Sequence, residues 1–284
     1  MVKSSVRRKI LGVIPARYTS SRFPGKPLAR IGSKSMLEHV FERTSQARYL
    51  TAVTIATDDE RIADAARSFG APVRMTRADH LSGTDRVAEV ASADTAELVV
   101  NIQGDDPLID PAAIDAAILP LLHDDDIAMG TLKKRIEDPR EIGDPNVVKV
   151  VTDRAGNAIY FSRSTIPYVR TVAPLPHGRG SEGRGAEGRG AEGRGAEGRG
   201  AKVAHYKHVG LYVYRRDFLL GYSDLPVGPL EQAERLEQLR ALENGYSIRV
   251  VETEYESLGV DTPEDLERVS KLFEASIQLA KPYG

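Results

Sequence analysis

The sequence contains no cysteine among its 284 residues. Disulfide bonds, thiolate nucleophiles, zinc knuckles and iron–sulfur ligation are therefore excluded. An excess of charge is also missing, because 39 lysines and arginines stand against 41 aspartates and glutamates, a formal net charge of −2. A general duplex-binding protein needs a basic field to displace counterions, so this balance argues against a nucleic-acid partner.

Long apolar runs are absent as well. The apolar run at residues 10–14 follows a basic start but is too short for the core of a signal peptide. No stretch approaches the roughly 20 apolar residues that a spanning helix needs. We therefore expect a cytoplasmic protein with no membrane partner. With 41% hydrophobic and 28% charged residues, the chain can bury enough apolar surface for one or two packed domains.

One segment of low complexity interrupts the chain. Residues 178–201 repeat the unit Gly-Arg-Gly-Ala-Glu and contain no large apolar residue. Such a segment cannot bury surface to offset its ordering entropy, so we expect a flexible loop insertion that acts as a spacer. An Arg-Gly segment that binds RNA is the alternative. The interleaved glutamates and the lack of aromatic residues argue against it.

Strand and helix signals alternate through the first half of the chain. Short apolar runs predict strands at residues 10–14, 53–56, 72–75 and 98–102, and apolar side chains at helical spacing predict helices after them. Thr57 and Glu60 have the spacing of a capping box, and Asp110 before Pro111 is typical of a helix start. Near-continuous apolar strands are buried on both sides. This order therefore predicts an α/β fold, a mostly parallel sheet with helices on both faces.

The pattern changes after residue 126. Strand-like segments at residues 129–135, 147–152, 158–162 and 208–214 have few helices between them, which indicates an added antiparallel lobe or sheet edge. Helical spacing returns over residues 229–242, and Thr262 with Pro263 begins the last helix. We expect one domain, with a core of about residues 8–135 and 225–280 and a smaller lobe of about residues 155–222.

Ligands of an open parallel sheet bind beyond the carboxyl ends of its strands, so the segments that follow the strands are the candidates. The first, residues 15–28, carries Arg17, Arg22 and Lys26 among small hydroxyl residues and a glycine. Guanidinium groups match phosphate oxygens, and small residues let backbone N–H groups approach a phosphate. The segment is neither a dinucleotide fingerprint nor a Walker A loop. A solvated basic loop is the alternative, but the position after the first strand favours phosphate binding.

Carboxylates border two other predicted elements. Asp105 and Asp106 come directly after the fourth predicted strand, and Asp261 precedes the last helix. Mg²⁺ prefers hard oxygen ligands, often one or two carboxylates together with substrate phosphates. The structural alternatives are an Asp-Pro turn and a favourable charge at a helix start. Asp105 and Asp261 are so far apart in the sequence that spacing alone leaves their meeting open.

A polar segment over residues 75–86 offers donors and acceptors suited to a base or a ribose. His80 within it could act as a general base, although a hydrogen-bonded structural histidine is the commoner role. Taken together, these segments predict nucleoside triphosphate chemistry with Mg²⁺.

Beyond these patterns, the chain resembles the 3-deoxy-D-manno-octulosonate (Kdo) cytidylyltransferases. The resemblance extends from Ile14 to Val269 outside the repeat and is carried by segments that include IPARYTSSRFPGKPL, MTRADHLSGTDRVAEV, VVNIQGDDPLI, DPNVVKVV, YFSRSTIPY, HVGLYVYRRDF, PLEQAERLEQLRALENG and GVDTPEDLERV. The combination of IPAR with PGKPL is typical of the wider sugar nucleotidylyltransferases. The segments TRADHLSGTDR, FSRSTIP and LEQLR are more specific to the Kdo enzymes. Asp106 is a departure, because the family usually has Glu there.

The resemblance implies that CTP and Kdo react to give CMP-Kdo and pyrophosphate for lipopolysaccharide biosynthesis. It implies a nucleotide-sugar transferase fold and a homodimer, with the smaller lobe at the dimer contact. By the same resemblance, the triphosphate is bound by Arg17, Arg22 and Lys26, and Mg²⁺ by Asp105 and Asp261. The resemblance also implies that the cytosine and the ribose are bound by Arg77, Ser82 and Gln103. It implies that the sugar substrate is bound by Arg163, His208, Tyr212, Glu237 and Gln238. Catalysis is implied for Asp105, Asp261, Lys26 and Arg17.

Structural roles are the alternatives at two of these positions, because Tyr212 could be strand core and Glu237 a helix-face charge. Three other functions also stay open. A cytidylyltransferase could act on sialic acid or another acidic nonulosonic sugar. An inactive nucleotide-binding protein would bind CTP without turnover, which the retained Asp105, Asp261, Lys26 and Arg17 argue against. An RNA-interacting protein would depend on the repeat.

Overall fold

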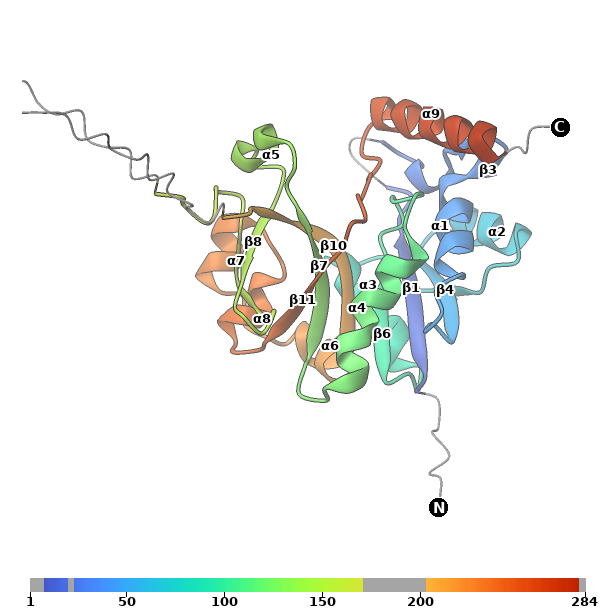
Figure 1. Cartoon of the computed structure of the whole chain (residues 1–284). Helices are drawn as coiled ribbons and strands as arrows, with labels where there is room; N and C mark the ends of the chain where they lie inside the picture. The colour runs from blue at the N-terminus through green and yellow to red at the C-terminus, as the bar shows by residue number, and fades with distance from the viewer. Residues whose placement is uncertain (1–7, 20–22, 171–202, 281–284) are drawn as a thin grey trace, which may run out of the picture.

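The computed structural model describes residues 8–19, 23–170 and 203–280, with side chains described up to residue 274 (Figure 1). Arg22 and the repeat at residues 178–201 lie outside the described residues, so the expectations for them stay predictions. Within the described ranges, no helix has both the length and the apolar character needed to cross a membrane.

One mixed sheet of nine strands organises the described part of the chain. Its spatial order is β11-β7-β10-β6-β1-β4-β5, and β8 with β9 extends it from β10. Neighbours along this order run parallel except where β10 pairs with β6 and β7. The predicted mostly parallel sheet is confirmed. The strands are β1 (Ile10–Ala16), β4 (Ala52–Thr57), β5 (Val73–Met75), β6 (Leu98–Asn101), β7 (Met129–Arg135), β8 (Lys149–Thr152), β9 (Ala158–Ser162), β10 (Tyr206–Arg215) and β11 (Ile248–Glu252).

Helices cover both faces of the sheet, as its apolar strands require. Successive side chains of a strand point to opposite faces, and β1 divides its residues accordingly. Ile10 and Ile14 pack with α1 (Met36–Thr44), α2 (Glu60–Ser68) and α4 (Pro111–His123). Leu11 and Val13 pack with α3 (Gly83–Ser92), α6 (Arg216–Tyr222) and α8 (Leu239–Glu243). Both faces of β1 are therefore buried in the core. Because core side chains cannot reach a ligand, functional side chains must lie at or beyond the end of the strand.

The C-terminal helix α9 (Pro263–Ala280) is fixed at both its start and its side. Thr262 and Asp265 form the predicted cap, since each backbone N–H donates to the other residue's side chain. Val260 and Val269 are buried with Ile31 of β2 (Arg30–Ile31) and Met36 of α1. β2 pairs with β3 (Lys34–Ser35), and Figure 1 shows α9 at the same end of the molecule as α1. Asp261, the residue before this cap, donates its own backbone N–H to Asp265 Oδ2 at 3.1 Å, which ties it to the start of the helix.

The predicted capping box at Thr57 and Glu60 is wrong. Asp59 caps α2 instead and accepts a hydrogen bond from the backbone N–H of Arg61. The Thr57 hydroxyl accepts from the backbone N–H of Asp59 and so shapes the preceding turn. An aspartate two residues after the threonine lies closer to the helix start, and it takes the cap.

The helix predicted over residues 229–242 is broken in two. Its parts are α7 (Pro229–Glu234) and α8, and Arg235 between them has a φ of 56°, in the left-handed region. α7 buries no side chain, whereas Leu236 and Leu239 are buried in the core beneath the sheet. The chain turns at Arg235 so that the leucines after it face that core.

The smaller lobe expected over residues 155–222 is not a separate sheet. Its longest strand, β10, lies within the main sheet between β6 and β7, and β8 with β9 is joined to it. Figure 1 shows this hairpin beside α7 and α8, at the end of the sheet away from α1 and α2. The sequence predicted either an added antiparallel lobe or an antiparallel edge of the main sheet, and the structure shows the sheet edge. The remaining helix, α5 (Pro139–Gly143), lies between β7 and β8 in the chain.

Gly130 permits the close packing of α4 on β7, and its replacement should destabilise the fold. A Cβ atom there would lie 2.7 Å from Leu121 Cδ1 and 3.2 Å from the Ala117 carbonyl oxygen. We expect Gly130→Ala to lower the free energy of unfolding by about 1–3 kcal/mol, measured by urea titration.

Gly221→Ala is the matched control for this substitution. Gly221 lies in α6, and nothing stands within 4 Å of a Cβ atom added there. We expect this variant to be unchanged or more stable, by up to about 1 kcal/mol. Equal behaviour of the two variants would contradict the steric account of Gly130.

Candidate active site

A cleft of about 400 Å³ opens at the carboxyl ends of β1 and β6. Five of the predicted site residues line it: Arg17, Lys26, Gln103, Asp105 and Asp261. They come from the segments after β1, after β6 and before α9. The sheet edge therefore brings together side chains that are far apart in the sequence, as expected for an open parallel sheet.

Lys26 joins the two aspartates. Its Nζ lies 2.6 Å from Asp105 Oδ2 and 3.2 Å from Asp261 Oδ1. The Lys26 side chain is 15% exposed, against 31% for Asp105 and 50% for Asp261, so the two carboxylates are the more exposed groups of this contact. The question that spacing left open is answered: Asp105 and Asp261 meet at one point.

Backbone constraints place Lys26 and Asp105. Gly25 has a φ of 72°, which favours glycine, and it precedes a short 3₁₀ helix (Lys26–Leu28) with Pro27 in its first turn. A Cβ atom at Gly104 would lie 2.9 Å from the Pro15 carbonyl oxygen. Only glycine lets the segment after β6 lie this close to β1, and Asp105 is the next residue.

Arg17 ties the phosphate segment to the start of α3. Its guanidinium donates to the carbonyl oxygens of His80, at 2.9 Å, and Ser82, at 2.8 Å. Ser82 caps α3 in a capping box with Asp85, and Gly83 borders the cleft. The helix thus directs its N-terminal end, which favours anions, toward the cleft. Sequence reasoning named Ser82 but missed this orientation of α3.

Arg77 and Ser82 line a neighbouring cavity of about 760 Å³ rather than the Lys26 cleft. Arg77 is exposed and paired with Asp79 at 2.9 Å. His80 hydrogen bonds to the Glu89 carboxylate, the structural role weighed for it from the sequence. The base-and-ribose segment therefore forms its own wall beside the phosphate cleft.

A second group of predicted residues gathers around β10. His208 and Tyr212 lie with ring centroids 5.3 Å apart, and the His208 ring hydrogen bonds to Thr131 Oγ1 at 2.9 Å. Burial lowers the pKa of His208 to about 3, so its imidazole is neutral. Burial also raises the pKa of Tyr212 and that of the Glu237 carboxyl, which hydrogen bonds with the Thr84 side chain.

Gln103 connects this group to the cleft. Its side-chain amide donates to the Gly210 carbonyl oxygen at 3.1 Å, within the irregular stretch of β10 between His208 and Tyr212. Because β10 pairs antiparallel with β6, Tyr212 stands opposite Asn101 at the end of β6. The predicted sugar residues of β10 therefore adjoin the predicted phosphate residues.

Arg163 and Gln238 are held by the protein itself. The Arg163 guanidinium donates to the carbonyl oxygens of Glu234, at 2.8 Å, and Pro145, at 3.0 Å. Gln238 is 4% exposed at the start of α8. These contacts anchor the loop after β9 to α7, and a sugar contact by Arg163 stays a prediction.

Asp106, Tyr255 and Ser257 form a hydrogen-bonded group at the carboxyl edge of the sheet that the sequence did not predict. Asp106 is 4% exposed, and its Oδ2 accepts hydrogen bonds from the Tyr255 hydroxyl and from Ser257 Oγ, the latter at 2.6 Å. Burial raises the pKa of this carboxyl. The aspartate was visible beside Asp105, but no periodicity or motif marked Tyr255 or Ser257 as its partners.

The donor set at the cleft suits a hard divalent cation. Asp105 and Asp261 present carboxylate oxygens toward one point, where the Lys26 ammonium supplies positive charge. Among the described residues, no group of three or more His, Cys, Asp or Glu side chains is arranged around a common point. The protein thus offers two carboxylates, the number with which Mg²⁺ commonly combines substrate phosphates and water.

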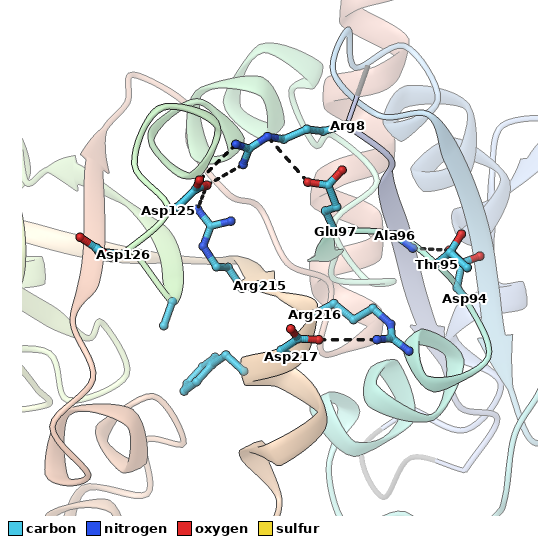
Figure 2. A pocket seen from close by; sticks show the side chains of 12 residues that line it. Arg8, Asp94, Thr95, Ala96, Glu97, Asp125, Asp126, Arg215, Arg216 and Asp217 are labelled. Atoms are coloured by element: carbon cyan, nitrogen blue, oxygen red, sulfur yellow. Dashed lines mark hydrogen bonds and ion pairs between the residues drawn. The ribbon is translucent and has the colours of Figure 1, made fainter. Parts of the chain in front are cut away.

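A further cavity, of about 680 Å³, lies at the opposite edge of the sheet, near the amino ends of β1 and β6 (Figure 2). Its arginines are engaged within the protein. Arg8 pairs with Asp125 at 2.8 Å, and Arg215 donates to the carbonyl oxygens of Leu121 and Asp124. None of the predicted site residues is among those that line it. Size alone does not identify the active site here.

Comparison with known proteins gives consistent similarities. The cytidylyltransferase family model matches residues 11–251. The chain is 70% identical over 270 residues to 3-deoxy-manno-octulosonate cytidylyltransferase of Solibacter usitatus, covering 95% of this chain and 96% of that protein. It is 55% identical over 261 residues to the protein of the same name from Geobacter metallireducens, covering 92% and 96%.

Solved structures show the same similarity. CMP:2-keto-3-deoxy-manno-octonic acid synthetase complexed with CTP superposes with a TM-score of 0.81 at 40% identity, covering 94% of this chain and 99% of that one. A cytidylyltransferase from Leptospira borgpetersenii shares the fold, with a TM-score of 0.54 at 16% identity and coverage of 98% and 100%.

The neutral state of His208 predicts a pH dependence of stability. The unfolded chain binds a proton at this histidine below about pH 6.5, whereas the folded chain does so only near pH 3. Stability should therefore fall as pH drops below 6.5, by up to about 1.4 kcal/mol per pH unit. His208→Gln lacks this group, so from pH 7 to pH 5 it should lose up to about 2 kcal/mol less than the unmodified protein in urea titrations. Parallel losses would contradict the assignment.

Proposed function

The chain belongs to the cytidylyltransferases, in the group of 3-deoxy-manno-octulosonate enzymes, and we propose that it activates Kdo with CTP. The products are CMP-Kdo and pyrophosphate. The protein is a nucleotidyltransferase, and its product serves lipopolysaccharide biosynthesis. The observation that carries the proposal is the meeting of Lys26, Asp105 and Asp261 in the cleft at the carboxyl edge of the sheet.

Asp105 and Asp261 would hold Mg²⁺, for which their carboxylate oxygens are suited. A bound Mg²⁺ supplies Lewis-acid stabilisation of negative charge on the phosphates. Lys26 lies against both carboxylates and reduces their mutual repulsion. It is also within the cleft that would receive the triphosphate, where its charge complements the phosphate oxygens.

The reaction is a direct in-line transfer without a covalent enzyme intermediate. The anomeric oxygen of Kdo forms a bond to the α-phosphorus of CTP as the bond to the bridging oxygen of pyrophosphate breaks, and the hydroxyl proton is released. Arg17 and Lys26 stabilise the negative charge that develops on the leaving pyrophosphate. Catalysis by this chain therefore consists of positioning and electrostatic stabilisation.

The group around β10 would bind the sugar. His208 and Tyr212 are neutral and can hydrogen bond to hydroxyl groups, and Gln103 links them to the phosphate cleft. Arg77 and Ser82 border the adjacent cavity, which is suited to the cytosine and ribose. Arg163, Glu237 and Gln238 complete the assignment as the resemblance implies it.

We also propose that the protein acts in the cytoplasm as a homodimer. Support for the dimer comes from apolar side chains that are exposed on and near β9 and α7: Ile159, Tyr168, Val227 and Leu230. Ser162 of β9 hydrogen bonds to Glu234 of α7, so Ile159 and Leu230 lie on neighbouring elements, and exposed apolar surface on neighbouring elements is typical of an interface between proteins.

A pyrophosphate-release assay tests the function. With CTP, Mg²⁺ and Kdo we expect release of one pyrophosphate per CMP-Kdo formed, and no release when EDTA removes the metal. Sialic acid in place of Kdo is expected to support little or no release. Release that is faster with sialic acid would reassign the acceptor, and CTP binding without any release would reject the enzymatic function.

Asp105→Asn tests the role of the carboxylate pair. The substitution keeps the shape of the side chain but removes its charge, and we expect kcat to fall by at least about 10²–10³-fold. Asp126→Asn makes the same change at the opposite edge of the sheet, in the cavity of Figure 2, and should leave kcat unchanged. Near-normal turnover by Asp105→Asn would exclude the metal assignment.

A further inference from the structure

The chain between β11 and α9, residues 253–262, is called the edge segment here. It leaves β11 at one side of the sheet and reaches the cleft beside β1. On its way it crosses the carboxyl ends of β7 and β6 and, between them, the amino end of the antiparallel β10. Thr253 donates its backbone N–H to the Lys133 carbonyl oxygen of β7, and Glu256 pairs with Lys207 of β10 at 2.5 Å. The segment has no regular secondary structure, so side chains and single backbone contacts fix its course.

The last contacts of the edge segment are made with the residues just after β6. The Tyr255 hydroxyl and Ser257 Oγ both donate to Asp106 Oδ2. Three residues further on, the Val260 backbone N–H donates to the Asp105 carbonyl oxygen at 2.9 Å. Asp261 follows directly. The Asp106 carboxylate and the Asp105 carbonyl thus hold the edge segment just before Asp261, whose carboxylate contacts the same Lys26 ammonium as that of Asp105.

Asp106 has no part in the cleft. It is 4% exposed, it is not among the residues that line the cleft, and its Oδ2 accepts both hydrogen bonds from the edge segment. A buried carboxylate that accepts two hydroxyl donors is a strong and directional anchor. In metal sites, groups that orient the ligands in this way change metal affinity by about 10–100-fold when they are replaced.

We propose that Asp106 is a positioning residue, which sets the separation of Asp105 and Asp261 by holding the edge segment through Tyr255 and Ser257. The proposal rests on the metal role of the two aspartates in the proposed function. Asp106 would thus raise the affinity of the site for the divalent cation without contacting it, whereas Asp105 and Asp261 would bind the cation directly.

Cation binding without turnover is the test. Mn²⁺ serves as the probe, and its free concentration is measured by electron paramagnetic resonance in the presence of protein and CTP without Kdo, against CTP alone. Asp106→Asn removes the charge that both hydroxyls bind. We expect Mn²⁺ affinity in the ternary complex to weaken about 10–100-fold. Asp106→Glu retains the carboxylate and should restore most of the affinity.

Two further variants keep the test decisive. Tyr255→Phe removes one of the two hydroxyl donors to Asp106 and leaves residues 105 and 106 unchanged. It should also weaken Mn²⁺ binding, even if Asp106→Asn fails to fold. Thr51→Val is the matched control, because it removes two hydrogen bonds to the Ile10 backbone at the opposite edge of the sheet. It should lower the melting temperature and leave Mn²⁺ affinity unchanged.

The outcomes separate the positioning role from the proposed function. If Asp106→Asn and Tyr255→Phe melt earlier but bind Mn²⁺ within about twofold of the unmodified protein, Asp106 is only structural and the inference is wrong. If the unmodified protein adds no Mn²⁺ binding to that of CTP alone, the metal role of Asp105 and Asp261 fails, and the inference fails with it.

Discussion

The contact of one ammonium group with two carboxylates is the interaction on which the candidate site depends. Lys26, Asp105 and Asp261 come from three separate parts of the chain, so the contact exists only when all three are folded together. Two carboxylates near one point repel each other unless positive charge lies between them. Lys26 supplies this charge within the protein, and the same electrostatic demand makes the site suited to a divalent cation and a triphosphate.

Each of the three charged residues in this contact is positioned by a different feature of the local backbone. The left-handed Gly25 turns the chain into the 3₁₀ helix that begins at Lys26. Gly104 permits the approach of the Asp105 segment to β1, because any larger residue would meet the Pro15 carbonyl. Asp261 precedes the capped start of α9, and the edge segment before it is bound to the residues after β6. Backbone sterics and buried hydrogen bonds, rather than the attraction of the charges, therefore place the charges.

The reversed direction of β10 gives the site its second half. A strand parallel to β6 would have its last residues at this edge. Because β10 is antiparallel to β6, its earlier residues lie there instead, and these include His208 and Tyr212. The result is a charged half, around Lys26, beside a half whose histidine and tyrosine are neutral. Phosphates and sugar hydroxyls make different electrostatic demands, and the two halves match them.

Local patterns in the sequence determined the elements that repeat a simple geometry. The continuous apolar run of β1 and the caps of α4 and α9 depend on neighbouring residues, so they could be predicted, as could the cationic and acidic segments beyond the strands. The break at Arg235 and the cap at Asp59 could not be predicted. In each case two local conformations compete, and the free-energy difference between them is too small for a sequence pattern to show which one forms. The meeting of Asp105 with Asp261, and of Asp106 with its hydroxyl donors, was decided by the tertiary structure alone. Such contacts depend on how strands are ordered in the sheet and on the path of an irregular segment, and neither leaves a period in the sequence.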